Sequence, residues 1–207
     1  MEESYITLRG AGESRYEEKK SVFIGYARPL SAEKEATAFI AEIKQKHPDA
    51  RHHVYAYLLR DNHLMRYSDD REPQGTAGLP VLDVLRKSSC VDAGIVVVRY
   101  FGGTLLGTGG LVRAYTAAAQ EAIRAAGILI CRQMTTFSAE VSYADYQKLL
   151  PVLTMQGAEV ENTDFGACVK VSFSLESAKT DGLATAVFDA TGGRAILVET
   201  GARFAGK

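Results

Sequence analysis

The chain has 207 residues, of which 46% are hydrophobic and 24% charged, and its formal net charge is -1. This balance indicates a soluble globular protein of one large or two small domains, and it excludes nucleic-acid binding through overall charge, so any such surface must be local. The sequence has no apolar run long enough for a signal peptide or a membrane span, and we therefore expect a cytoplasmic protein that does not contact membranes.

The three cysteines are Cys90, Cys131 and Cys168, and no two of them form a CxxC pair. An odd, widely spaced set argues against a disulfide framework and against a cysteine zinc site. We expect reduced, buried thiols.

The first part of the chain predicts alternating strands and one helix. Residues 4–10 and 21–27 have the alternation of strands, and residues 31–48 have the pattern of a helix. Ser31 is the expected N-cap of this helix and Pro48 its stop.

The middle of the chain predicts two more strands, at 53–59 and 63–68, which flank a hairpin turn at Asp61-Asn62. A turn-rich acidic stretch then leads to a short helix at 81–88. Residues 93–101 are apolar without alternation, which is typical of a central strand covered on both faces. The helix after the next loop has a face of small alanines that would let it lie close to a sheet.

The last 75 residues predict a second domain with the order β-α-β-β-α-β, the split βαβ of ferredoxin-like folds. The expected elements are 135–143, 144–157, 158–165, 167–175, 177–193 and 194–199. Pro151 should bend the first of these helices or end it early. We place the domains at 1–132 and 133–207, with an excess of basic residues in the first and of acidic residues in the second. The predicted class is α+β.

A glycine cluster follows the strand 93–101 and opens a helix. Its members are Gly102, Gly103, Gly107, Gly109 and Gly110. Bare amides at a helix start can bind an anion, and Arg99 and Arg113 would suit phosphate or carboxylate. The stretch is neither a P-loop nor a GxGxxG fingerprint, since Val112 stands where the last glycine would be. The alternative is that the glycines only permit tight turns and close packing.

Two aromatic residues precede the glycine cluster. Rings at Tyr100 and Phe101 could stack on bases. We assign Tyr100 to the candidate binding surface and expect Phe101 to pack in the core.

An acidic loop precedes the short helix. Its motif residues are Ser68, Asp69, Asp70, Arg71, Glu72, Pro73, Gly75 and Thr76. The carboxylates could brace the turn itself, could receive arginines or amides of the glycine loop, or could bind Mg²⁺ with a ligand phosphate. We rank structural bracing first, contact with a partner group second and metal third.

The histidines give no metal site. His52 and His53 are adjacent, so on a strand they point to opposite faces. No HExxH or GxSxG motif is present, and we expect no metal, no cofactor and no catalytic residue.

The segments YSDDREPQGTAGLPVLDVL and IVVVRYFGGTLLGTGGLVRAY, at 67–85 and 95–115, resemble the YigZ/IMPACT family, and the resemblance extends along the whole chain. It implies an N-terminal β-α-β crossover domain similar to the fourth domain of elongation factor G and a ferredoxin-like C-terminal domain similar to its fifth. The family usually has SDDGEP, whereas this chain has Arg71 in place of the glycine. If that position needs a positive φ, arginine has a steric cost there.

The resemblance also implies a function. Eukaryotic members regulate translation through a protein partner, and for bacterial members the family suggests binding to nucleic acid or the ribosome. Our first hypothesis is a non-enzymatic, translation-associated binding protein in which Arg99, Tyr100, the glycine amides and Arg113 meet RNA phosphate, with Arg71 assisting. The alternatives are a Mg²⁺-dependent enzyme or binder of a small phosphorylated ligand, and a regulator that acts on a protein partner. We make no prediction of oligomeric state.

Overall fold

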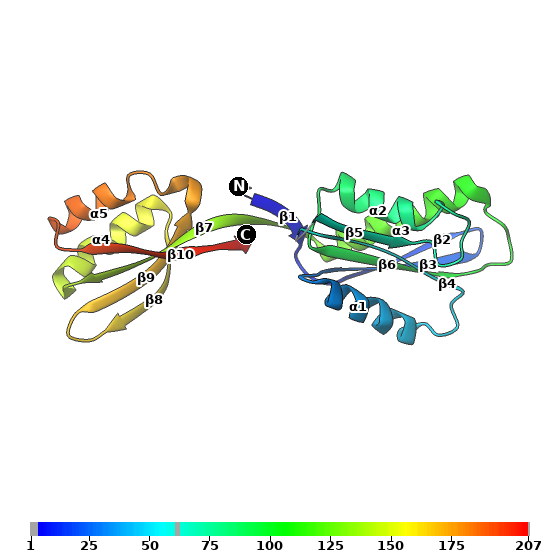
Figure 1. Cartoon of the computed structure of the whole chain (residues 1–207), viewed down its shortest axis with the longest axis horizontal. Coiled ribbons are helices and arrows are strands. Elements are labelled where there is room, and N and C mark those ends of the chain that lie inside the picture. Colours follow the sequence, from blue (N-terminus) through cyan, green and yellow to red (C-terminus); the bar gives the residue numbers. More distant parts are fainter. Residues whose placement is uncertain (1–3, 61–62, 207) are drawn as a thin grey trace. The chain divides into compact units, whose positions relative to one another are not determined.

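The computed structural model of the chain describes residues 4–60 and 63–206 (Figure 1). The chain divides into two compact units, residues 5–130 and residues 131–206 together with Ser4. The boundary that we place near Gln133 stays a prediction, and the turn expected at Asp61-Asn62 lies outside the described residues. Both units mix helices and antiparallel strands, which confirms the α+β class.

The first unit is built on one sheet with the strand order β2-β3-β6-β4-β5, in which all neighbouring strands are antiparallel. Its elements are β1 (Ser4–Leu8), β2 (Gly12–Glu18), β3 (Ser21–Pro29), α1 (Glu33–Lys46), β4 (His52–Leu59), β5 (Leu64–Ser68), α2 (Gly78–Lys87), β6 (Ala93–Tyr100) and α3 (Gly107–Ala126). Since β3 and β4 both run antiparallel to β6, they are parallel to each other, and α1 joins them. This is the crossover that the family resemblance implies.

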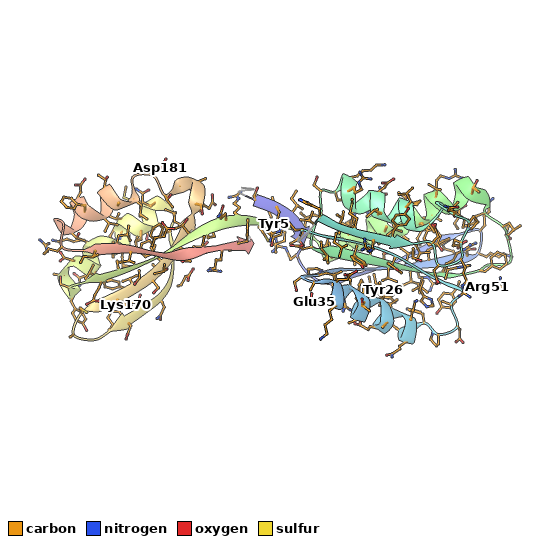
Figure 2. The ribbon with its side chains drawn as sticks, viewed as in Figure 1. Tyr5, Tyr26, Glu35, Arg51, Lys170 and Asp181 are labelled. Atoms are coloured by element: carbon orange, nitrogen blue, oxygen red, sulfur yellow. The ribbon has the colours of Figure 1, made fainter. Side chains whose placement is uncertain are left out.

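The sheet of the first unit is covered on both faces. Figure 1 shows α1 on one face and α2 and α3 on the other. Phe39 and Ile43 of α1 pack in one core cluster, to which Tyr26 of β3 also belongs (Figure 2), while Leu85 of α2 and Tyr115 of α3 pack in the other. Seven of the eight residues of β6 are buried, as expected for a central strand covered on both faces.

The alanine face of α3 lies against glycines of the sheet. A Cβ at Gly12 would collide with the backbone of Ala126, and one at Gly25 would lie 2.6 Å from the carbonyl oxygen of Ala118. The glycines of β2 and β3 and the alanines of α3 therefore allow the close helix-to-sheet approach that the small residues predict.

The second unit has the order β7 (Ile128–Val141), α4 (Tyr143–Gln156), β8 (Glu159–Phe165), β9 (Val169–Glu176), a 3-10 turn η2 (Ser177–Lys179), α5 (Leu183–Thr191) and β10 (Ile196–Gly206). Strand β7 pairs with β10 on one side and β9 on the other, and β9 also pairs with β8. This is the predicted ferredoxin-like arrangement.

Helix α4 does not end early at Pro151 but continues through it to Gln156, whereas the alternative of a bend at Pro151 stays a prediction. Pro151 is exposed, so the carbonyl that lacks a donor one turn earlier lies on the water-facing side of the helix. Ser142 fixes the start of the helix by accepting a hydrogen bond from the amide of Asp145.

Candidate functional site

The acidic loop uses its first carboxylate to hold its own backbone and the start of α2. Asp69 accepts hydrogen bonds from the amides of Gly75, Ala77 and Gly78 at 2.9, 3.1 and 2.8 Å. Because Ala77, the N-cap residue, has no side-chain acceptor, Asp69 supplies the cap of α2 from eight residues away.

The second carboxylate ties the loop to β4. Asp70 accepts a hydrogen bond from the amide of His53 at 2.7 Å, and its carbonyl oxygen lies 2.8 Å from Nδ1 of His52. Nε2 of the His53 ring lies 2.9 Å from the carbonyl oxygen of His47, and its Nδ1 lies 3.8 Å from the Asp70 carboxylate. Asp70 therefore contacts both adjacent histidines, while the hydrogen bonds of their rings go to different carbonyl oxygens.

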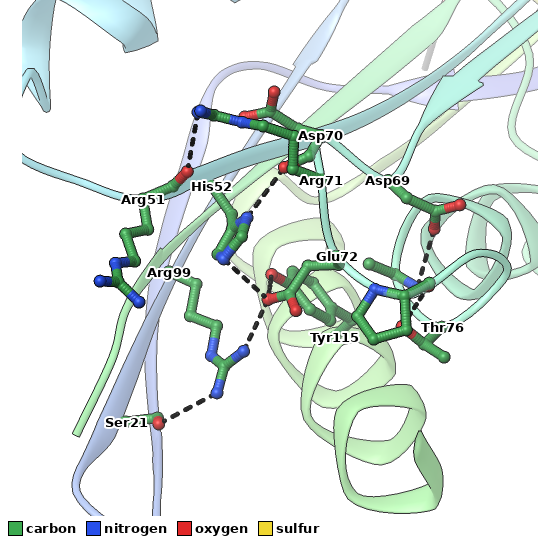
Figure 3. Close-up of polar contacts among 12 residues, drawn as sticks. Ser21, Arg51, His52, Asp69, Asp70, Arg71, Glu72, Thr76, Arg99 and Tyr115 are labelled. Atoms are coloured by element: carbon green, nitrogen blue, oxygen red, sulfur yellow. Dashed lines mark hydrogen bonds and ion pairs between the residues drawn. The ribbon is translucent and has the colours of Figure 1, made fainter. Parts of the chain in front are cut away.

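The third carboxylate is the centre of a buried network (Figure 3). Oε1 of Glu72 accepts hydrogen bonds from Nη1 of Arg99 at 2.7 Å and from the hydroxyl of Tyr115 at 2.8 Å, while Nε2 of His52 lies 3.8 Å away. The side chains of Arg99 and Glu72 are only 6% and 3% exposed. Burial, followed by the charge of Glu72, raises the pKa of Tyr115 far above its ordinary value.

Arg71 occupies a left-handed backbone position, with φ 71°. Its exposed side chain reaches back, where Nη2 donates a hydrogen bond to the carbonyl oxygen of Arg51 at 3.2 Å (Figure 3). A non-glycine residue in this conformation is strained. This is the steric cost that we expected if arginine replaces the glycine of SDDGEP at a position with a positive φ.

The glycine loop permits close backbone packing and positive φ angles, and it leads into a helix start that has no side-chain cap within the described residues. A Cβ at Gly102 would collide with the backbone of Lys20, and Gly103 and Gly107 have φ 82° and 71°. Helix α3 then begins at Gly107, and its N-cap residue Leu106 makes no side-chain cap within the described residues. The first amides of α3 therefore lack the partner that a capping side chain would give them, and they present partial positive charge.

The two loops meet in a pocket of about 350 Å³. Its lining comes from the end of the α1–β4 connection, the acidic loop, the end of β6 and the start of α3. The lining residues are Arg51, His52, Arg71, Glu72, Pro73, Arg99, Phe101, Leu105, Leu106, Gly107, Thr108 and Leu111. Three arginines thus converge with an uncapped helix start around one carboxylate.

Another pocket, of about 470 Å³, lies between α2 and α3. Its charged lining residues are one acid, Asp83, and one base, Lys87, together with uncharged side chains such as Val112 and Gln120. One acidic and one basic residue give this second pocket no net charge to attract an anion. We therefore take the first pocket, which three arginines line, as the candidate site and call it the arginine-lined pocket.

The structure brings some of the predicted site residues to the pocket and others to different places. Those in the pocket are Arg71, Glu72, Pro73, Arg99 and Gly107. Tyr100 is directed toward α1, where its hydroxyl lies 2.8 Å from Nδ1 of His47. Arg113 is exposed on α3 beside Gly109, outside the lining of this pocket.

The remaining motif residues shape the two loops. Ser68 accepts a hydrogen bond from the amide of Asp70, and the hydroxyl of Thr76 donates to the carbonyl oxygen of Pro73 at 2.6 Å. Gly75 has φ 75°, and Gly110 packs against Leu106.

Several pocket residues were not among the predicted site residues, chiefly Arg51, His52, Phe101 and Leu105. Phe101 was expected in the core, but it is 42% exposed and lines the pocket, because β6 ends one residue earlier and the chain turns away from the sheet. The only feature of the sequence that could have indicated a binding role for Phe101 was its aromatic side chain. Arg51 and Leu105 belong to loops whose partners depend on the tertiary fold.

The chain matches two families along its length. Residues 19–123 match the Impact N-terminal domain, and residues 140–194 match a domain of unknown function, DUF1949. A solved structure described as a hypothetical protein covers 96% of this chain and 98% of its own, with 32% identity and a TM-score of 0.61.

Curated relatives agree with these matches. IMPACT family member YvyE of Bacillus subtilis is 34% identical over 96% of this chain and 92% of its own length, and IMPACT family member YigZ of Escherichia coli is 36% identical over 78% and 80%. An IMPACT family member of Haemophilus influenzae is 34% identical over 93% and 95%. With a matching domain over half of its length and relatives that align along most of it, this chain belongs to the IMPACT family.

Proposed function

We propose that this chain is a cytoplasmic, non-enzymatic binding protein in translation that contacts RNA through the arginine-lined pocket. Membership of the IMPACT family supports a translation-related regulatory protein in general. The observation that carries the RNA contact is the convergence of Arg51, Arg71 and Arg99 with the uncapped start of α3.

The charge of the pocket fits a phosphate group. Three guanidinium groups oppose the single carboxylate of Glu72, and the amides at the start of α3 add the positive end of a helix of 20 residues. Arginine matches phosphate oxygens with paired donors, and helix starts bind them through backbone amides. The pocket therefore attracts a phosphate more strongly than an exposed surface arginine would.

The acidic loop favours a binding protein over a Mg²⁺-dependent enzyme. The carboxylates of Asp69, Asp70 and Glu72 accept hydrogen bonds from backbone amides, from Arg99 and from Tyr115. The described part of the chain contains no group of three or more histidine, cysteine or acidic side chains placed to hold a metal ion. Bracing, which we ranked first for this loop, accounts for these contacts.

The test is RNA binding by the whole chain. We expect fluorescence anisotropy to detect binding of a labelled single-stranded RNA whose affinity falls as salt is added. Arg51→Ala and Arg71→Ala should each reduce the salt slope, by about 0.7 for every phosphate group that the variant no longer neutralises. Arg124→Ala is the matched control, because Arg124 lies near the other end of α3 and is paired with Glu121.

Arg113→Ala should have a smaller effect on RNA binding than the pocket variants, because Arg113 lies outside the lining of the pocket. Binding that is absent, or that Arg51→Ala and Arg71→Ala leave as strong as Arg124→Ala does, would refute the proposal.

A further inference from the structure

The pocket has an apolar wall that phosphate binding does not require. Phe101 is 42% exposed and Leu105 is 84% exposed, and both line the pocket together with Leu106 and Leu111. Exposed apolar side chains are common singly, but two on one short loop, beside arginines in one cavity, suggest a ligand with a flat apolar part.

We propose, on the basis of the RNA-binding function above, that the pocket takes one unpaired nucleotide. Its base lies against Phe101 and Leu105, and its phosphate lies at the start of α3 near Arg71 and Arg51. A base that enters the pocket cannot pair in a duplex at the same time. The site therefore selects single-stranded RNA or a strand end over double-stranded RNA.

The size of the pocket supports a single nucleotide. Its volume of about 350 Å³ lies at the lower end of ligand cavities, which are roughly 300–1,000 Å³. Such a cavity suits a single nucleotide but is far too small for a duplex. A protein that followed only the backbone would need cations along a surface rather than a cavity with an apolar wall.

Arg99 supports a ligand inside the cavity, rather than only at its rim. Its guanidinium is held by Glu72 and by Ser21, whose Oγ is 3.4 Å from Nη2, and its Nε has no hydrogen-bond partner within the described part of the chain. A buried donor without a partner is uncommon and is disfavoured. Arg99 also lines the pocket, so the oxygen atoms of a nucleotide would bring acceptors close to this guanidinium.

The same arginine positions the aromatic ring. The guanidinium carbon of Arg99 lies 5.6 Å from the centroid of Phe101, within the range of a cation–π contact. A ring held in place in this way loses less freedom when a base stacks on it. The contact thus links the buried charge to the proposed stacking position.

The experiment uses the whole chain and a single-stranded RNA that carries one 2-aminopurine. We expect the fluorescence of 2-aminopurine to fall on binding, because its base stacks in the pocket. Phe101→Ala should weaken binding about tenfold and restore the fluorescence of the bound RNA, since stacking on one aromatic ring contributes on this order. Leu105→Ala should act in the same direction, and its side chain is too exposed for the change to disturb folding.

Competition identifies the part of the nucleotide that binds. We expect a nucleoside monophosphate to displace the labelled RNA at lower concentration than ribose 5-phosphate or inorganic phosphate, and duplex RNA to compete poorly. Phe188→Ala and Met155→Ala are matched controls, because both side chains are exposed and belong to the second unit. Thermal unfolding of each variant verifies that it is folded.

The outcomes separate this inference from the function on which it rests. If Arg51→Ala and Arg71→Ala weaken RNA binding but Phe101→Ala and Leu105→Ala do not, or if duplex RNA competes as well as single-stranded RNA, the single-nucleotide site is refuted and RNA binding stands. If the arginine variants bind RNA like the unchanged chain, or no RNA binds, the proposed function itself fails.

Discussion

Arg71 combines an unfavourable backbone conformation with a side chain at the rim of the pocket. Its φ of 71° is one that glycine adopts freely. A left-handed conformation costs an L-residue about 1–2 kcal/mol. Arginine adds a guanidinium that lines the pocket and donates a hydrogen bond to the carbonyl oxygen of Arg51. A glycine at this position would have neither.

Two substitutions at Arg71 separate these effects. Both Arg71→Gly and Arg71→Ala remove the guanidinium, so both should weaken RNA binding to the same extent. Arg71→Gly should be more stable than Arg71→Ala by about 1 kcal/mol, because only glycine relieves the strain. Urea unfolding measures the difference, and equal stability of the two variants would show that the left-handed conformation carries no strain.

At the scale of residues, the sequence predicted the importance of the two loops but not which side chains would meet. Arg99 and Tyr100 are neighbours on β6, so they face opposite sides of the sheet, and only the placement of α1 decides that Tyr100 meets His47. The pairing of Arg99 with Glu72 joins residues 27 positions apart. The possibility that the acidic loop receives an arginine of the glycine stretch was open from the sequence, but the choice among alternatives needed the fold.

At the scale of elements, α2 depends on a cap from outside the helix. We expect Asp69→Ala to lower the free energy of unfolding by about 2 kcal/mol, since three amides lose a charged acceptor. Asp69→Asn should be intermediate, because one of its two side-chain atoms still accepts.

The control for this prediction is Asp83→Ala, which removes an exposed carboxylate from α2 itself. Its ion pair with Arg86 is on the surface, and such pairs contribute little. Urea unfolding of the three variants gives the comparison. An Asp69→Ala chain as stable as Asp83→Ala would show that the cap contributes little to α2.

Element prediction from sequence succeeded where one face of an element is buried. It failed for β2, whose residues alternate only between exposed and partly buried, so that its polar sequence has no hydrophobic period. Ser31 was predicted as the N-cap of α1, but the N-cap residue is Ala32, one residue later, and the helix begins at Glu33. Strand β10 continues to Gly206, beyond the expected end at 199, because it pairs with β7, and cross-strand pairing is not visible in local sequence.

At the scale of the whole molecule, each unit has a core of its own. Leu85 belongs to a core cluster of the first unit and Leu153 to that of the second, and both are fully buried. We expect Leu85→Ala and Leu153→Ala each to lower stability by about 2–5 kcal/mol, the usual effect of a cavity at a buried leucine.

Hydrogen exchange followed by mass spectrometry would locate these effects. Leu85→Ala should lower amide protection within residues 5–130, and Leu153→Ala should lower it within residues 131–206. Loss of protection throughout both units in both variants would show that the chain unfolds as one cooperative body.

Because the phenol of Tyr115 is buried, its ionisation can be used to follow unfolding by ultraviolet absorbance. The sequence has 10 tyrosines and no tryptophan, so the near-ultraviolet change on phenolate formation comes from tyrosine alone. Burial beside Glu72 raises the pKa of Tyr115, so the folded chain keeps this proton above pH 10, where an unfolded chain releases it, and stability must fall as the solution becomes more alkaline. Burial also raises the pKa of Tyr57, to about 12, so Tyr57 contributes to the late part of an alkaline titration as well. We expect Tyr115 to ionise only when the protein denatures, so that Tyr115→Phe removes one phenol from this late step. A late step as large in Tyr115→Phe as in the unchanged chain would contradict this.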